Sequence, residues 1–336
     1  MPIEEVRAGM VGVGRTVFEG TELKDFKVQI LGVLRNVQGP RRDLILARLE
    51  GAALAQSGVA QGMSGSPVFI DGRLIGAVSY SIGAFPKEPI AGITPIAEMK
   101  DATPLPRRAG TGQARLELPI TREGLAAALA SVSARMTPFA RRPADVQSIG
   151  LPNSAGAQLG AMLRPISTPL LLGGFEPETV DLVSGAFRDA GFAPTVTGMS
   201  GGAQPAAPAG PLREGDAIGV ALASGDIDLG ATGTITHIDG ERVYAFGHPF
   251  YNLGPAAFPL TRAHVYTILP SLMTSFKISS MGETIGTMTQ DRPTAIAGTL
   301  GKGPALVPMT VTLERSAEGS ASLRRRHLQR SDPRGP

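Results

Sequence analysis

One serine of this chain stands in a frame that suits a nucleophile, Gly62-Met63-Ser64-Gly65-Ser66-Pro67, and an apolar run follows it at Val68–Ile70. A serine hydroxyl attacks a carbonyl only from a bend at which backbone N–H groups face the developing oxyanion. Flanking glycines permit such a bend and leave room for a substrate. The oxyanion donors would be the N–H groups of Gly62 and Ser64. The alternative reading is an ordinary Gly/Ser turn before a strand.

A serine nucleophile needs a base, and the chain has four histidines. His237 and His264 lie in alternating apolar segments typical of strands, and His327 lies in a polar tail. His248 follows a predicted strand, between a glycine and a proline that fix a bend. It is therefore the candidate base, although a structural histidine in a loop is the alternative.

A histidine base is usually oriented by a carboxylate. Asp291 is the first candidate, because it belongs to the same β-rich segment as His248 and its spacing could place it across one small barrel. Asp43 and Glu50, which precede Ser64, are the alternatives. Each of the three could instead pair with a nearby arginine at the surface.

Other chemistries find little support in the sequence. The absence of cysteine excludes disulfides, thiolate catalysis and cysteine metal sites. The histidines lack metal-ligand spacing, Gly12-Val13-Gly14 lacks the third glycine of a dinucleotide fingerprint, and Gly301-Lys302-Gly303 lacks the spacing of a phosphate loop. We therefore expect neither a metal nor a cofactor.

Charge and hydropathy bound the partners. The net charge is +3, but the segment from Arg324 onward carries +4, which leaves −1 for the rest of the chain. The high pI thus belongs to the tail, and no nucleic-acid partner is expected. No run of 18 apolar residues predicts a transmembrane helix, and the start Met1–Glu5 is not a signal peptide.

Composition and periodicity divide the chain into five parts. Glycine and proline are abundant, which favours many short strands and turns. Turns at Asp71-Gly72 and Asp239-Gly240 predict hairpins, and the segments 70–77 and 238–245 resemble each other, so the two β regions could be related barrels. Residues 1–104 are predicted to form a β-barrel half with the serine frame, and residues 213–313 a β-barrel half with His248. Between them we expect a small α+β insert at 113–197, with two strand–helix–strand units that could form a ferredoxin-like fold, and a Gly/Ala/Pro-rich linker at 198–212. Residues 314–336 are predicted to be a basic disordered tail.

Together these segments resemble the SpoIVB-type serine peptidases, and the serine frame is similar to the Gly-x-Ser-Gly-x-Pro of trypsin-like peptidases. The likeness covers about residues 5–100 and 213–312 but not the insert. The matching segments are Gly58–Pro67, Ile70–Val78, Ile90–Ile96, Gly233–Thr236 and Ala245–His248.

The resemblance implies a mainly β fold of two trypsin-like barrels and a serine endopeptidase acting on proteins or peptides, with Ser64 as nucleophile and His248 as base. In the sporulation peptidase the histidine segment comes first, so this chain resembles the permuted, large secreted-type members. The resemblance also implies action outside the cytoplasm, with an export segment missing upstream of residue 1.

The family's acid would fall at about Leu49, which cannot serve. Either Glu50, Asp43 or Asp291 replaces it, or the site is a Ser–His dyad. The competing hypotheses are a non-catalytic peptide-binding or scaffold protein on a peptidase-like fold, and a self-cleaving regulator.

Overall fold

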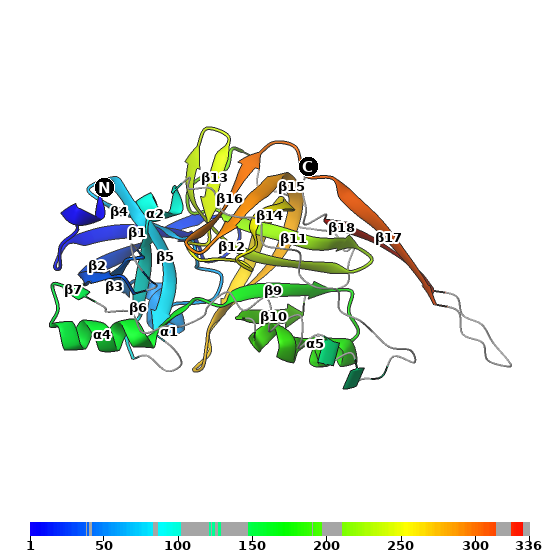
Figure 1. The fold of residues 1–336 in the computed structure, drawn as a ribbon, viewed down its shortest axis with the longest axis horizontal. Coiled ribbons are helices and arrows are strands. Elements are labelled where there is room, and N and C mark those ends of the chain that lie inside the picture. The colour runs from blue at the N-terminus through cyan, green and yellow to red at the C-terminus, as the bar shows by residue number, and fades with distance from the viewer. Residues whose placement is uncertain are drawn as a thin grey trace.

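The fold is known from a computed structural model and is mainly β, as the sequence predicts. The structure describes residues 1–37, 39, 42–82, 87–101, 121, 123–124, 127–128, 147–189, 191–196, 210–313 and 324–331. Two strand-rich bodies lie side by side along the longest axis of the molecule (Figure 1).

Six antiparallel strands close the first barrel, which lies at the left of Figure 1. They are hydrogen-bonded in the ring order β1-β2-β3-β6-β5-β4, and β4 returns to β1. The strands are β1 (Val11–Val17), β2 (Leu23–Arg35), β3 (Leu44–Glu50), β4 (Pro67–Ile70), β5 (Arg73–Ile82) and β6 (Ile90–Pro95).

The hairpin predicted at Asp71-Gly72 is confirmed, and it joins β4 to β5. Both turn residues have positive φ angles, 49° at Asp71 and 72° at Gly72. Such a turn matches the right-handed twist of the flanking strands, and aspartate and glycine tolerate it best. The short helices α1 (Ala52–Ser57) and α2 (Ile96–Met99) follow β3 and β6, and a single helical turn, Ile3–Glu5, precedes β1.

The second barrel closes in the ring order β11-β12-β13-β16-β15-β14, again with antiparallel pairs throughout. If the strands of each barrel are numbered along the chain, both rings read 1-2-3-6-5-4. The two barrels therefore share one topology, consistent with a trypsin-like pair. The strands are β11 (Ala217–Gly225), β12 (Asp228–Asp239), β13 (Arg242–Ala245), β14 (Gly254–Leu269), β15 (Phe276–Arg292) and β16 (Ala295–Leu300).

The two similar segments noted in the sequence occupy different places in these rings. Residues 70–77 form the hairpin between the fourth and fifth strands of the first barrel. Residues 238–245 form the hairpin between the second and third strands of the second barrel. The likeness between these two segments thus reflects the same Asp-Gly turn. The similarity of the two barrels lies instead in their common strand order.

The described part of the insert extends both barrels. The strand–helix–strand unit that the sequence suggests within Leu163–Val196 is present, and its two strands pair in parallel. Its first strand pairs with β12, while β7 pairs with β2 and β8 pairs with β5, so these strands form no separate ferredoxin-like sheet. The predicted unit at Arg115–Arg142 and the linker at 198–209 lie outside the described residues. The elements are β7 (Gln147–Ile149), α4 (Asn153–Met162), β8 (Leu163–Pro165), β9 (Thr168–Gly173), α5 (Pro177–Asp189) and β10 (Phe192–Val196).

A hairpin of β17 (Leu306–Leu313) and β18 (Arg324–Ser331) extends from the body at the right of Figure 1. The sequence predicts a disordered tail from residue 314, and the structure differs at β18. This strand pairs with Ala223–Gly225 of β11. Backbone pairing with an open strand edge does not require an apolar sequence, which explains why polarity alone gives no sign of it.

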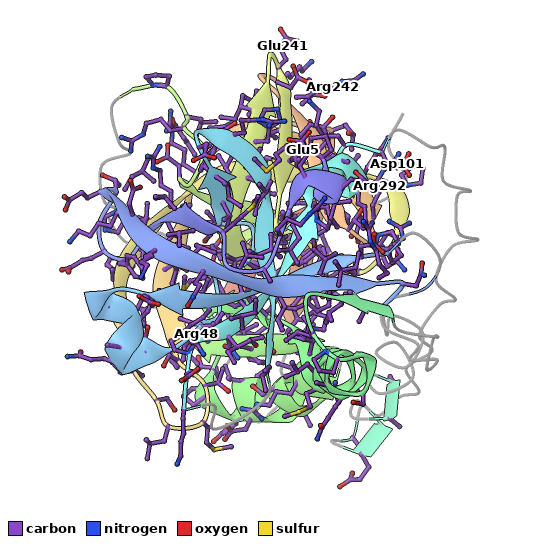
Figure 2. The ribbon with its side chains drawn as sticks, turned by 90° about the vertical axis from the view of Figure 1, so that its left-hand side faces the viewer. Glu5, Arg48, Asp101, Glu241, Arg242 and Arg292 are labelled. Carbon is purple, nitrogen blue, oxygen red and sulfur yellow. The ribbon has the colours of Figure 1, made fainter. Side chains whose placement is uncertain are left out.

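Each barrel encloses a hydrophobic core of its own, and a smaller cluster joins the two. In that cluster Val17 of β1 packs against Ala217, Ala263 and Val265 of the second barrel. Glu241 stands at the margin of the molecule in the view onto the first barrel (Figure 2). No helix in the described part of the chain is both long and apolar enough to cross a membrane.

Candidate active site

Ser64 lies in a tight loop, residues 58–66, between the third and fourth strands of the first barrel; we call this segment the serine loop. Most backbone N–H groups around Ser64 are engaged: Met63 donates to Ala60 (3.1 Å) and Gly65 donates to Val78 (2.8 Å). Among the described residues, no acceptor is found for the backbone N–H groups of Gly62 and Ser64. These are the two donors that the sequence predicts for an oxyanion hole.

The serine loop docks directly onto β12 of the second barrel. The Thr234 N–H donates to the Ser64 carbonyl (2.9 Å), and the Thr234 hydroxyl donates to the Gly62 carbonyl (3.0 Å). Gly65 has a φ of 96°, and a Cβ on it would overlap the Thr234 carbonyl oxygen. Glycine at this position therefore allows both the turn and the close approach of the two barrels.

The histidine segment makes the reciprocal contact with the first barrel. It lies between the third and fourth strands of the second barrel. The Gly247 carbonyl accepts the Thr94 hydroxyl of β6 (2.7 Å), and a Cβ on Gly247 would lie 2.8 Å from the Ser79 Cβ of β5. Phe246, which is fully buried, has a φ of 70°, a strained conformation for a bulky residue. Equivalent loops of the two barrels thus meet at their interface.

The ring of His248 is fixed in one tautomer. Its Nδ1 lies 2.8 Å from the Pro249 carbonyl oxygen, and because a carbonyl can only accept, Nδ1 carries the proton. The lone pair is therefore on Nε2. The side chain is buried, and this desolvation lowers the pKa of His248 to about 4. At neutral pH the ring is uncharged, with Nε2 able to accept a proton.

Four buried side-chain polar atoms in the described part of the chain lack a hydrogen-bond partner, and two of them are Ser64 Oγ and His248 Nε2. Their segments touch, since a Cβ on Gly65 would lie 2.6 Å from the Phe246 nitrogen. The two atoms do not bond to each other. Ser64 is 0 % exposed and His248 is 2 % exposed, so the site is closed in this structure.

Asp291, at the end of β15, does not contact the His248 ring through a hydrogen bond. Its carboxylate instead accepts backbone N–H groups of Phe250 (2.8 Å), Tyr251 (2.7 Å) and Leu253 (3.1 Å), just after His248. Burial raises the pKa of Asp291 to about 6, and these bonds oppose the rise. Asp291 therefore holds the loop that carries the histidine, not the ring itself.

The neighbour of Asp291 ties this region to the first barrel. The guanidinium of Arg292 donates to the backbone carbonyl of Asp101, and the two residues lie side by side in Figure 2.

The other two acid candidates have partners elsewhere in the first barrel. Asp43 forms an ion pair with Arg35 and accepts the Asn36 N–H (2.9 Å). Glu50 pairs with Lys27 at the surface (2.8 Å). The structure brings neither carboxylate to Ser64 or His248 through a hydrogen bond.

Two groups beside the candidate site are absent from the sequence-based prediction. One is the Pro249 carbonyl, which orients His248 and which no side-chain pattern can reveal because it is a backbone atom. The other is Lys277, a fully buried lysine whose side chain lies against Gly62. Its signal was a lone cation between Phe276 and Ile278 in an apolar strand.

A groove of about 470 Å³ opens beside the serine loop. Val59 and Gln61 of that loop line one side, and the turn between β14 and β15 lines another. Leu272 and Met273 of this turn are exposed by 89 % and 66 %, which is unusual for large apolar side chains. In the described part of the chain, no group of three His, Asp or Glu side chains is placed to hold a metal ion.

Comparison with known proteins gives one match. No curated protein and no solved structure matches the chain. Residues 2–96, which contain the whole first barrel and the serine loop, match the family model described as SpoIVB peptidase S55. Over these residues the chain is similar to the SpoIVB-type peptidases.

Proposed function

We propose that the protein is a serine endopeptidase in which Ser64 is the nucleophile and His248 the general base. The observation that carries this proposal is the pair of unpartnered polar atoms, Ser64 Oγ and His248 Nε2, on two loops that meet at the barrel interface. Buried polar atoms are nearly always bonded, so two orphans on touching loops call for a functional reason. The peptidase family match is independent support.

In the proposed reaction, Ser64 Oγ attacks the carbonyl carbon of a peptide bond while His248 Nε2 takes the hydroxyl proton. The imidazolium then gives this proton to the leaving amine, and an acyl-enzyme remains on Ser64. Water then attacks the acyl carbon while His248 takes one of its protons, and this proton passes to Ser64 Oγ as the Oγ–carbon bond breaks and the acid product leaves. The N–H groups of Gly62 and Ser64 would stabilise the oxyanion, since both lack another acceptor.

We propose a dyad, not a triad. The Pro249 carbonyl sets the tautomer that a carboxylate sets in a triad, and Asp291 acts one step further back by holding residues 250–253. A neutral carbonyl stabilises an imidazolium less than a carboxylate does. The pKa of about 4 at His248 is consistent with this weaker support.

A substrate reaches Ser64 only after the closed site opens, because the hydroxyl is fully buried. The groove beside the serine loop is the proposed approach for an extended polypeptide. We therefore expect small acylating reagents to react with Ser64 faster than folded proteins are cleaved.

The test is labelling with a small fluorophosphonate, followed by intact mass and peptide mapping. Wild type should gain one adduct on Ser64, and Ser64→Ala should gain none. Ser154→Ala, which removes an exposed serine on α4, is the matched control and should label like wild type. If no adduct forms, or if Ser64→Ala labels as fast as wild type, the peptidase proposal fails.

A non-catalytic binding protein is the second candidate, and the closed site with no carboxylate on His248 favours it. It predicts that wild type forms no adduct and that Ser64→Ala binds peptides as tightly as wild type.

A self-cleaving regulator is tested by incubating purified wild type and Ser64→Ala and measuring the length of each chain over time. Only a self-cleaving protein shortens in wild type and stays intact in Ser64→Ala.

A further inference from the structure

The backbone at the start of β15 is hydrogen-bonded to the serine loop. The Gln61 N–H donates to the Ser275 carbonyl (2.8 Å), and the Lys277 N–H donates to the Gln61 carbonyl (3.0 Å). Gln61 and Phe276 thereby form a short parallel bridge between the two barrels. The residue that follows Gln61 is Gly62, a proposed oxyanion donor. The two hydrogen bonds of Gln61 therefore fix the backbone immediately before that donor.

The Lys277 side chain continues this contact along Gly62. A Cβ built on Gly62 would lie 3.2 Å from Lys277 Cβ and Cδ and 3.3 Å from Cγ. Two bonds separate Cδ from Nζ, so the ammonium stands within about 6 Å of that point. Nζ donates to the Thr16 hydroxyl of β1 (2.8 Å). The lysine therefore runs from the second barrel, past Gly62, to a strand of the first.

Stability alone does not account for a lysine at this place. Lys277 is 2 % exposed, and no carboxylate among the described residues pairs with it. Burial is the cause that lowers the pKa of Lys277 to about 7. A methionine would fill the same volume without a desolvation cost.

The charged groups on the neighbouring elements are turned to other partners. On β1 the Arg15 side chain pairs with Asp25 at the surface (2.7 Å), and on β14 Arg262 pairs with Glu283 (3.0 Å) while the His264 ring packs against Tyr266. The serine loop carries no titratable side chain.

Building on the proposed function, we propose that Lys277 is a positioning residue of the oxyanion side. Its methylene chain holds the Gly62 peptide in place, and its ammonium stands behind that peptide, where it favours negative charge on the substrate oxygen. An ammonium in a water-poor interior acts over several ångströms because little solvent screens it. The proton stays on Lys277 throughout, and the lysine forms no bond to the substrate.

Lys277→Met keeps the length and packing of the side chain and removes the charge. We expect the limiting rate of fluorophosphonate labelling to fall about tenfold or more, with the apparent affinity for the reagent unchanged. In wild type the rate should fall as pH rises through about 7, because Lys277 loses its proton there. Lys277→Met should lack this fall. Its melting temperature should equal or exceed that of wild type, which separates the effect from misfolding.

Thr16→Val tests the same ammonium without changing the lysine. It removes the hydroxyl that accepts from Nζ, so the charged form becomes less favourable and the alkaline fall in rate should move to lower pH. A purely structural role would change melting but not this profile. If Lys277→Met does not fold, an unmoved profile in Thr16→Val overturns the proposal.

The two proposals fail in different ways. If Ser64-dependent labelling occurs but Lys277→Met matches wild type in rate and pH profile, the role of Lys277 is refuted and the peptidase stands. If wild type is not labelled at all, the peptidase proposal fails, and the role of Lys277 fails with it.

Discussion

At the scale of single residues, the candidate base is oriented by its own chain. The Pro249 carbonyl accepts the Nδ1 proton of His248 and leaves the Nε2 lone pair as the basic site. This bond is local, so the tautomer survives movements of the loop as a whole. Asp291 acts on His248 indirectly, because its carboxylate accepts hydrogen bonds from the backbone N–H groups that follow the histidine.

The first prediction concerns the acid limb of activity. The pKa of His248 is lowered from 6.5 to about 4, so the ring is neutral and able to accept a proton above about pH 4. We expect the labelling rate of Ser64 to rise through about pH 4 and to be level by about pH 6. The rate of adduct formation, measured by quenching the reaction at fixed times at a series of pH values from 3 to 7, tests this expectation. A rise centred near 6.5 would show instead that the ring is solvated in the reactive state.

The second prediction concerns Asp291. Asp291→Asn keeps one acceptor oxygen, which can take the place shared by the N–H groups of Tyr251 and Leu253, but it then turns an amide donor toward the Phe250 N–H. We expect unfolding to become easier by roughly 2–4 kcal/mol and labelling of Ser64 to slow. Denaturant titration and the labelling assay measure the two effects.

Glu50→Gln is the matched control for Asp291→Asn, since it also removes one carboxylate. Glu50 pairs with Lys27 at the exposed surface, so we expect a stability change below about 1 kcal/mol and an unchanged labelling rate. Slower labelling in Glu50→Gln would restore this residue as the acid of the site.

At the scale of elements, the loops that carry Ser64 and His248 are fixed by close backbone approach. The serine loop touches β12 at Gly65, and the histidine segment touches β5 at Gly247. Neither contact leaves room for a side chain. The glycines thus define how near the barrels come to each other.

The third prediction compares two glycines that both have positive φ. A Cβ at Gly65 would overlap the Thr234 carbonyl, whereas a Cβ at Gly72 would meet open space in the β4–β5 turn. We expect Gly65→Ala to cost about 3 kcal/mol or more and to abolish labelling of Ser64. Gly72→Ala should cost about 1 kcal/mol and leave labelling intact. Equal melting temperatures for the two variants would contradict the docking of the serine loop on β12.

Much of the element pattern could be predicted from the sequence, because turn chemistry and alternation are local. The Asp71-Gly72 hairpin and helix α5 are examples. Strand β18 could not be predicted, because Arg324–Ser331 is polar and shows no alternation of apolar residues, although it pairs with the neighbouring β17 and with the distant β11. The pairing of insert strands with both barrels is non-local in the same way.

The candidate site could be proposed from its residue types, and the catalytic roles of its residues stay a prediction. Ser64 and His248 stood out by their glycine-flanked frames, and the structure brings their segments into contact. The role of Asp291 in holding backbone, the Pro249 carbonyl and the buried amine of Lys277 depend on tertiary contacts, which a single sequence does not encode in any local pattern.

At the scale of the whole molecule, the candidate site belongs to neither barrel alone. The N–H of Thr234 in the second barrel donates to the carbonyl of Ser64 in the first, and Lys277 reaches Thr16 in the opposite direction. Separation of the two barrels would therefore break contacts that hold Ser64 and Lys277 in place.

The fourth prediction follows from this interlocking. Hydrogen exchange of the Thr234 N–H across the interface should be as slow as that of the Gly65 N–H, which bonds within the first barrel to Val78. Both should exchange only by global unfolding. Mass spectrometry of short peptides measures them. Exchange of Thr234 far ahead of Gly65 would show that the barrels separate before they unfold.

The shared ring order of the barrels has an evolutionary consequence. Each half offers the loop between its third and fourth strands, so the serine and the histidine occupy corresponding places in two copies of one architecture. The contacts between the two barrels depend on how the barrels face each other. They do not depend on which barrel comes first in the chain. A duplicated ancestor could therefore have its halves exchanged by recombination without any change to the residues at their junction.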